Sequence, residues 1–208
     1  MDHEKVPALK IPDQDWFEAV MPLLSTKVRA VLLLITLHGL RISEAVERKP
    51  ADLDTNKWRL TIPDTKSGEP VRIPLSRPVI EAIREIMAEK RAEDEKRKAK
   101  GKLPRRTEWL FGTGSRRNIS RDIAKACVRA GVASYGTHAA CRHSFATRVL
   151  DHGKSLKFLM AAGRWKTANA DAEVWPSGAI RGQRRGECDS RELEARAAIQ
   201  QGDPAEKG

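Results

Sequence analysis

The N-terminal part of the chain places its hydrophobic residues at helical spacing. Asp13 is a suitable N-cap for the segment "IPDQDWFEAVMPLL", and Ser25 or Thr26 is one for "STKVRAVLLLITLHGL". The second segment is apolar on nearly every side from Val28 to Leu37, which is typical of a buried helix. Gly39 follows it and favours a helix end, because glycine adopts the left-handed conformation without strain. The pattern therefore predicts two opening helices, the second in the core.

The hydrophobic period then shortens from that of a helix to that of a strand. The segment "RISEAVERK" still predicts a short third helix, with Ser43 as its cap. After it, "KWRLTIP" and "PVRIPL" alternate with a period of two, and the turn-forming stretch "DTKSGE" separates them. This arrangement predicts a β-hairpin with Lys66 near its tip.

The second half of the chain is mainly helical by the same criteria. The segment "SRPVIEAIREIMAEKRAEDEKRKAKGK" predicts a helix that begins on the core and ends in water, and "EWLFGTG" predicts a short buried strand. Further helices are expected in "ISRDIAKACVRAG", ending at Gly131, from about Thr137 to Leu150, and in "SLKFLMAAGRWKT", ending at Gly163. The charged run that closes the long helix is either a solvated helix end or an arm that contacts DNA.

The length of the chain allows one full-sized domain or two small ones. From Pro176 onward Gly, Arg, Glu and Gln dominate, with few large apolar residues, so residues 176–208 are expected to form a tail that is either flexible or a detachable helix.

The chain carries a strong positive charge on a globular composition. Of its 208 residues 40% are hydrophobic, which is enough to build a core. A net charge of +11 favours a polyanionic partner, nucleic acid before an anionic membrane surface. No apolar run approaches the roughly 18 residues of a membrane span, and the N-terminus lacks the apolar stretch of a secretion signal. We therefore expect a cytoplasmic, DNA-associated protein without a membrane partner.

The cysteines indicate a reduced protein without a metal centre. They are three in number and widely spaced, so a disulfide framework is not expected. A zinc site is an alternative that no CxxC or HxxxH pair supports. Its ligands would be Cys127, His138, Cys141 and His143. The sequence predicts neither a metal nor a cofactor.

Four motifs carry the candidate chemistry. They are "HGLRISEA" with Arg41, "TKSGEPVRIPL" with Lys66, "THAACRHSFATR" with His138 and Arg142, and "LMAAGRWKTA" with Trp165. In this order, with a hairpin after the first, they resemble the catalytic domain of the tyrosine recombinase and phage integrase family. The resemblance covers roughly residues 10 to 175, and it implies a single catalytic domain over residues 11–175 after an N-terminal tail of residues 1–10. It implies a mainly α fold with a small antiparallel β-hairpin or sheet.

The chemistry of that family explains why such side chains would converge. Attack on a DNA phosphate places extra negative charge on its oxygens, which preorganised cations stabilise. By the resemblance, Arg41 and Arg142 clamp the scissile phosphate with their planar guanidinium groups. Lys66 would protonate the leaving 5′ oxygen, His138 would assist proton transfer, and the Trp165 indole would donate to a phosphate oxygen.

Two further residues are assigned supporting roles. Glu44 lies one turn past Arg41 and would orient a group of the site. His143 is assigned to structure, since the matching family position supports the helix. Each motif residue also has an ordinary alternative, such as a solvated helix-end charge for Arg41, a soluble turn residue for Lys66 or a core side chain for Trp165.

The family's defining tyrosine has no counterpart at the expected place. Aligning Trp165 with the family's His or Trp position puts the nucleophile at Val174, which has no hydroxyl. The only tyrosine, Tyr135, lies in the loop before the second arginine motif, where a structural role is favoured. His138 precedes Arg142 by four residues where the family has three, and one residue turns a helical side chain by about 100°.

The resemblance implies a DNA strand transferase that acts on double-stranded DNA in DNA integration and site-specific recombination. Its rival is a catalytically inactive, truncated integrase relative that acts only as a DNA-binding module, and the absent tyrosine favours it. A third hypothesis is an RNA-binding or purely structural protein with accidental motifs. The sequence leaves a homo-oligomer on DNA open.

Overall fold

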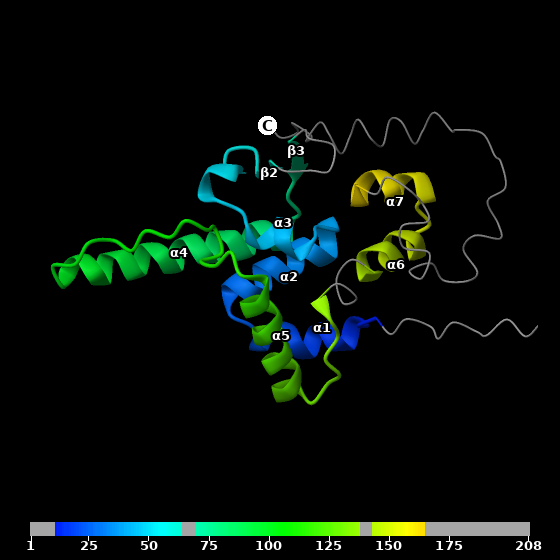
Figure 1. Ribbon diagram of the computed structural model, residues 1–208, viewed down its shortest axis with the longest axis horizontal. Helices are drawn as coiled ribbons and strands as arrows, with labels where there is room; N and C mark the ends of the chain where they lie inside the picture. The colour runs from blue at the N-terminus through cyan, green and yellow to red at the C-terminus, as the bar shows by residue number, and fades with distance from the viewer. Residues whose placement is uncertain (1–10, 64–69, 138–142, 165–208) are drawn as a thin grey trace, which may run out of the picture.

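The computed structural model describes residues 11–63, 70–137 and 143–164, and within them the chain is mainly helical with one small sheet (Figure 1). The helices are α1 (Gln14–Val20), α2 (Thr26–His38), α3 (Ile42–Val46), α4 (Arg77–Ala99), α5 (Arg116–Ala130), α6 (Ser144–Asp151) and α7 (Leu156–Gly163). Two 3-10 turns, Met21–Leu23 and Pro50–Asp52, and three strands, β1 (Leu53–Asp54), β2 (Arg59–Ile62) and β3 (Val71–Pro74), complete the fold. This confirms the predicted fold class.

Helix α2 forms the centre of the core, as its pattern predicts. Ser25 caps its N-terminus by accepting the backbone N–H of Val28 (3.5 Å). Gly39 ends it in the left-handed conformation with φ 62°, and its N–H donates to the Ile35 carbonyl (3.1 Å). Leu32 and Leu34 in the middle of the helix are fully buried. Both predicted ends of this helix are confirmed.

The sheet is antiparallel in the order β1-β2-β3. The register pairs Leu60 with Ile73 and Thr61 with Arg72, which confirms the predicted hairpin. Leu60 and Ile62 face the core and are fully buried, whereas their neighbours Arg59 and Thr61 lie on the outer face. The short strand β1 was not predicted, because its two residues are too few to show alternation.

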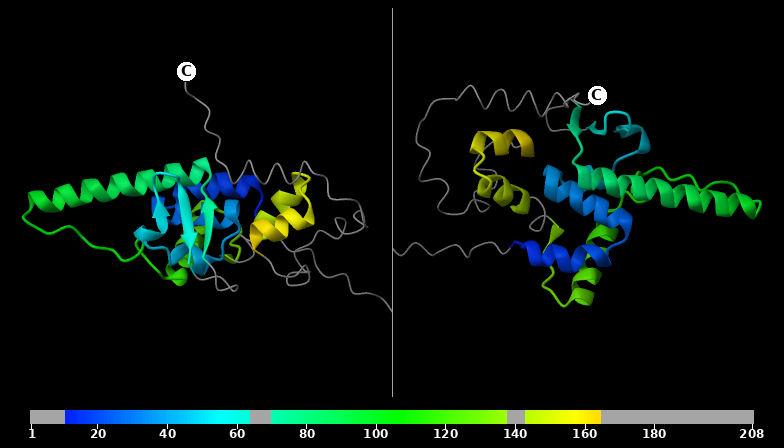
Figure 2. Two further views of the ribbon diagram at one scale, coloured as in Figure 1. Left: turned by 90° about the horizontal axis from the view of Figure 1, so that it is seen from above. Right: turned by 180° about the vertical axis from the view of Figure 1, so that it is seen from behind.

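Helix α4 begins on the core and then leaves it. Its buried residues Val79, Ala82, Ile83 and Ile86 all lie in its first half. The second half extends away from the body of the molecule, at the opposite end from α6 and α7 (Figure 2). The predicted change from a core-facing to a solvated helix is confirmed.

Two local predictions are wrong. The segment "EWLFGTG" is not a strand but a turn, in which Phe111 is buried and Gly112 adopts φ 74°. The Leu110 N–H donates to the Arg48 carbonyl (2.6 Å), so this segment has a loop partner instead of a sheet partner.

The N-cap of α3 is Arg41 and not Ser43, because Glu44 reaches back to accept the Arg41 backbone N–H (2.8 Å).

Helices α6 and α7 form a small second cluster of buried residues beside the main core. Phe145 and Ala146 of α6 pack with Leu159 of α7. Helix α6 begins at Ser144, and the earlier part of the predicted helix, at residues 138–142, lies outside the described residues. Helix α7 ends at Gly163 as expected, but the residue in the left-handed conformation is Arg164 (φ 56°).

Candidate functional site around Arg41, Glu44 and Arg164

The first candidate residue, Arg41, lies at a corner between two helices. The backbone leaves α2 at Gly39 and is extended at Arg41 (φ −68°, ψ 150°), which then caps α3. One turn later the α3 residue Glu44 faces back toward it. The sequence sets this corner locally, because a left-handed glycine and an acidic residue three positions after the N-cap both favour it.

Glu44 connects two arginines from distant parts of the chain. Its Oε1 accepts Arg41 Nη1 (3.0 Å), and its Oε2 accepts both the Arg41 backbone N–H (2.8 Å) and Arg164 Nη2 (2.7 Å). The side chains of Glu44 and Arg164 are 11% and 14% exposed, whereas that of Arg41 is 38% exposed. The carboxylate therefore ties the end of α7 to the start of α3 and holds Arg41 at the surface.

The electrostatics of Glu44 follow from these contacts. Burial by itself raises the pKa of its carboxyl, but the hydrogen bond from the Arg41 backbone and the positive charges of Arg164 and Arg41 outweigh it. The pKa of Glu44 is lowered as a result. The carboxylate is thus ionised at neutral pH and remains an acceptor for both guanidinium groups.

Arg164 was not predicted as a site residue from the sequence. This residue directly follows Gly163 in the motif "AAGRWK", and its proximity to Trp165 was the one available signal. Its Nη1 is buried and has no hydrogen-bond partner within the part of the chain that the structure describes. A buried donor without a partner is destabilising, and such groups are often retained for function.

His38, at the end of α2, was also missed. Its Nε2 accepts the Ser76 backbone N–H (3.2 Å) and lies 3.1 Å from the Ser76 hydroxyl. Burial, and then the positive charge of Arg164, lower the pKa of His38 to about 4. The imidazole is therefore neutral at pH 7, as its role as an acceptor requires. It ties the N-cap of α4 to the helix that leads into Arg41.

Close packing joins the Arg41 corner to α6. A Cβ placed on Gly39 would lie 2.7 Å from Cδ1 of Phe145, so only glycine fits at this contact. Phe145 comes from the motif "RHSFAT" and Gly39 from "HGLRISEA". The described residues thus bring parts of the first, third and fourth motifs to one place.

Five of the predicted site positions lie outside the described residues. They are Lys66, His138, Arg142, Trp165 and the nucleophile position Val174. Their convergence on one phosphate therefore stays a prediction.

Two more predicted residues lie within the described part of the chain. His143 is buried, at 9% exposure. Tyr135 packs edge-on against Trp16 with ring centroids 6.0 Å apart, and the Trp16 indole donates to the Ala133 carbonyl (2.8 Å). These contacts give Tyr135 a structural place beside α1.

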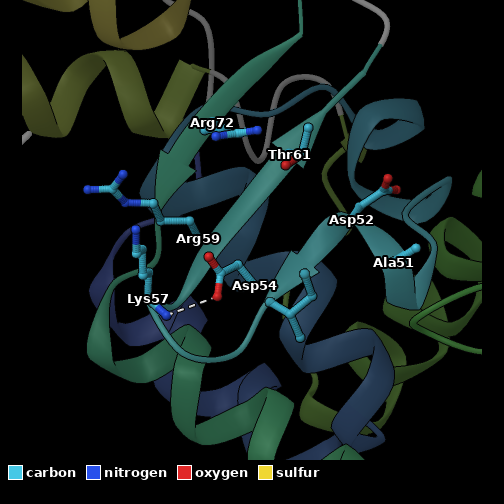
Figure 3. Close-up of a pocket in the computed structure, with 8 residues that line it drawn as sticks. Ala51, Asp52, Asp54, Lys57, Arg59, Thr61 and Arg72 are labelled. Carbon is cyan, nitrogen blue, oxygen red and sulfur yellow. Dashed lines mark hydrogen bonds between the residues drawn. The ribbon is translucent and has the colours of Figure 1, made fainter.

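A second polar feature lies on the outer face of the sheet. Figure 3 shows a hollow of about 280 Å³ whose lining includes Lys57, Arg59 and Arg72. Asp52 and Asp54 line the same hollow, and Asp54 accepts the Lys57 backbone N–H (3.1 Å). Because both signs of charge are present, the hollow has no strong preference for an anion.

Comparison with known proteins identifies the class of this chain. Residues 14–170 match the model of the phage integrase family. The chain is 29% identical over 162 residues to the integrase/recombinase y4qK of Sinorhizobium fredii. This match covers 74% of this chain and 47% of that protein. It is 32% identical over 132 residues to the tyrosine recombinase XerD of Mycobacterium leprae, covering 62% and 41%. The chain belongs to the phage integrase family.

Solved structures show the same fold. A crystal structure of XerA recombinase superposes with a TM-score of 0.65 at 16% identity, covering 86% of this chain and 64% of that one. XerH recombinase bound to its difH substrate gives a TM-score of 0.59 at 18% identity, covering 93% and 54%. The chain spans about half the length of the curated relatives it matches. No helix among the described residues is long and apolar enough to cross a membrane.

Proposed function

We propose that this chain is a DNA-binding catalytic domain of a tyrosine-type recombinase, which engages double-stranded DNA at a scissile phosphate in strand cleavage and rejoining. It would act in the cytoplasm on chromosomal or mobile DNA, with Arg41 as one phosphate ligand. Lys66, His138, Arg142 and Trp165 would complete the site.

The observation that carries the proposal is the position of Arg41. Its guanidinium is held along one side by Glu44 and is still 38% exposed. Among the described residues nothing else accepts from it, so its remaining N–H groups are available to an anion. A guanidinium fixed in this way presents a preorganised fork to two phosphate oxygens.

The network around Arg41 supports the same role. Glu44 neutralises part of the charge of Arg41 and Arg164, which allows two cations to lie close together. Arg164 precedes Trp165, so the ion pair also ties the fourth motif to the first. The named relatives are integrases and recombinases, and XerH was solved on its difH DNA substrate.

A binding measurement tests this proposal. We expect Arg41→Gln to lower affinity for a random-sequence duplex about tenfold, because one charge-assisted phosphate contact is lost. The slope of log affinity against log salt should fall by about one. The control is Arg77→Gln, which removes an exposed arginine that pairs with Glu81. Equal affinities for the two variants would refute the role of Arg41.

A cleavage assay separates the enzyme from the binding module. A nicked suicide duplex of a mapped target should trap a covalent protein–DNA adduct if the chain cleaves as it stands. If it only binds, Val174→Tyr or Trp175→Tyr should create the adduct, and Arg41→Gln should then abolish it. An adduct that disappears in Tyr135→Phe would show that the assignment of the nucleophile position is wrong.

A further inference from the structure

The second half of α4 is the part of the molecule least explained by the fold. We call residues 88–106, the end of α4 and the segment after it, the α4 arm. No residue of the α4 arm is buried, and Leu103 at its far end is 84% exposed. The arm projects from the body in every view (Figures 1 and 2). Since none of its residues belongs to the core, packing gives no reason for its length.

Charges are separated along the α4 arm. Its acidic residues that follow Glu89, namely Glu93, Asp94 and Glu95, lie on the side nearer the body. From residue 96 to residue 106 there are seven Lys or Arg and no acidic residue. Five of these seven lie in residues 96–102, at the tip itself, which therefore carries a formal charge of +5 in a chain whose total is +11. Positive charge concentrated at an exposed tip favours the binding of a polyanion.

The segment that follows α4 folds back along the helix and is fixed to it. Arg97 Nε donates to the Leu103 carbonyl (2.9 Å), and the Arg105 N–H donates to Asp94 Oδ1 (3.3 Å). Arg105 also pairs with Glu93 at 3.9 Å. These contacts involve Glu93 and Asp94 and leave the tip lysines without a side-chain partner in the described part of the chain. Those lysines are Lys96, Lys98, Lys100 and Lys102, all exposed.

The length and anchoring of α4 relate the tip to the Arg41 site. Ser76, its N-cap, is hydrogen-bonded to His38, which precedes Arg41 by three residues. From there the 23 residues of the helix extend about 34 Å. This is about the length of one turn of B-form DNA. A duplex that passes the Arg41 site and runs along α4 would present its next turn of phosphates to the tip.

We propose that the α4 arm is a second contact for duplex DNA, about one helical turn away from the phosphate at Arg41. The inference rests on the proposed function, since it needs a duplex at Arg41. The contact is to phosphates alone, because flexible lysines are point charges without the geometry for base recognition. It would add affinity only to duplexes long enough to reach from the Arg41 site to the tip.

The competing explanation is a solvated helix end with no partner. Glu93 and Asp94 lie four residues before Arg97 and Lys98, a spacing that stabilises an isolated helix. Basic residues in the last turn also interact favourably with the helix dipole. This explanation predicts that neutral tip residues leave DNA binding unchanged.

The experiment compares duplexes of two lengths. The variant Lys98→Gln, Lys100→Gln, Lys102→Gln removes three tip charges, and Arg121→Gln, Lys125→Gln, Arg129→Gln removes three exposed charges from α5 as a matched control. Affinity is measured by fluorescence anisotropy on random-sequence duplexes of about 12 and about 32 base pairs, which differ by nearly two helical turns. On the long duplex we expect the tip variant to bind about tenfold or more weakly, with a salt slope lower by two to three.

The outcomes distinguish this proposal from the proposed function. The arm contact would be overturned if the tip and control variants lost the same affinity on the long duplex. It would also be overturned if the tip variant lost the same affinity on both duplexes. Neither result would bear on the Arg41 site. An equal loss of binding to polyglutamate would likewise overturn it in favour of an acidic protein partner. If Arg41→Gln has no effect while the tip variant does, the proposed function fails and the arm alone binds DNA.

Discussion

The Glu44 cluster, formed by Arg41, Glu44 and Arg164, and the α4 arm use the same kinds of charged side chains in opposite ways. In the cluster, one carboxylate joins two arginines at 2.7 to 3.0 Å, and Glu44 and Arg164 are almost covered. At the arm tip, four lysines are exposed and have no side-chain partner in the described residues. The first arrangement fixes the orientation of the Arg41 guanidinium, whereas the second provides positive charge far from that site.

This contrast indicates which charges stability depends on. A buried charge loses its hydration, so it must be compensated by a partner, and removing the partner is costly. An exposed charge keeps its hydration and is screened by salt, so its removal changes folding very little. We therefore expect variants of the two covered members of the cluster, Glu44 and Arg164, to act on folding, and variants of the tip to act on DNA binding.

The largest expected effect comes from Glu44→Ala. It leaves Arg164 buried without its counter-ion, and the free energy of unfolding should fall by about 3–5 kcal/mol in urea titrations. Glu47→Ala, one turn later and exposed, is the control and should change it by no more than about 0.5 kcal/mol. Similar values for the two variants would show that the ion pair with Arg164 does not form in solution.

A smaller effect is expected from acid. The pKa of His38 is lowered from 6.5 to about 4 by burial and by Arg164. Between these two values the unfolded chain binds a proton that the folded chain excludes, so stability is lost as the pH falls. Between pH 7 and pH 4.5 the free energy of unfolding of the wild type should fall by about 2–3 kcal/mol more than that of His38→Gln, whose side chain cannot be protonated. Parallel pH profiles in urea unfolding would contradict the buried neutral imidazole.

The packing of α6 on α2 is tested by Gly39→Ala. The new Cβ would lie 2.7 Å from a ring carbon of Phe145, and the residue must keep φ 62°. We therefore expect the free energy of unfolding, measured by thermal unfolding, to fall by about 2 kcal/mol. Gly131→Ala is the matched control, since Gly131 has φ 69° but no atom lies within 4 Å of a Cβ added there. It should lose only about 1 kcal/mol. If the two variants match, the contact with Phe145 carries no strain.

The smallest effect is expected at the arm tip. Lys98→Gln, Lys100→Gln, Lys102→Gln should change the free energy of unfolding by no more than about 0.5 kcal/mol. In the first half of the same helix, Ile86→Ala should cost about 2–5 kcal/mol, because Ile86 is only 5% exposed. A large loss from the tip variant would mean that the arm is part of the folded core after all.

Several elements could be predicted because their signals are local. The caps at Ser25 and Gly39, the hairpin and the fading apolar stripe of α4 all depend on neighbouring residues, and the structure confirms them. The turn at Phe111 was mistaken for a strand, since a short apolar run looks the same in both. Its conformation depends on the Arg48 carbonyl, which the local sequence does not indicate.

The candidate site was predictable only in part. The motifs indicated Arg41 and Glu44, and the structure places these two in contact. Arg164 and His38 escaped notice because each acts through a partner far away along the chain. Arg164 pairs with a residue 120 positions away, and His38 with one 38 positions away. Sequence spacing contains no signal for such a pair.

Residue types and their short-range spacing were sufficient for the class of protein, the order of helices and hairpin, the positive charge and the identity of the motif residues. Contacts between distant segments of the folded chain established that Glu44 joins Arg41 to Arg164, that Gly39 admits Phe145, and that the basic run forms the tip of a projecting arm. The two kinds of feature differ because burial and ion pairing arise from distances in space, which folding alone sets.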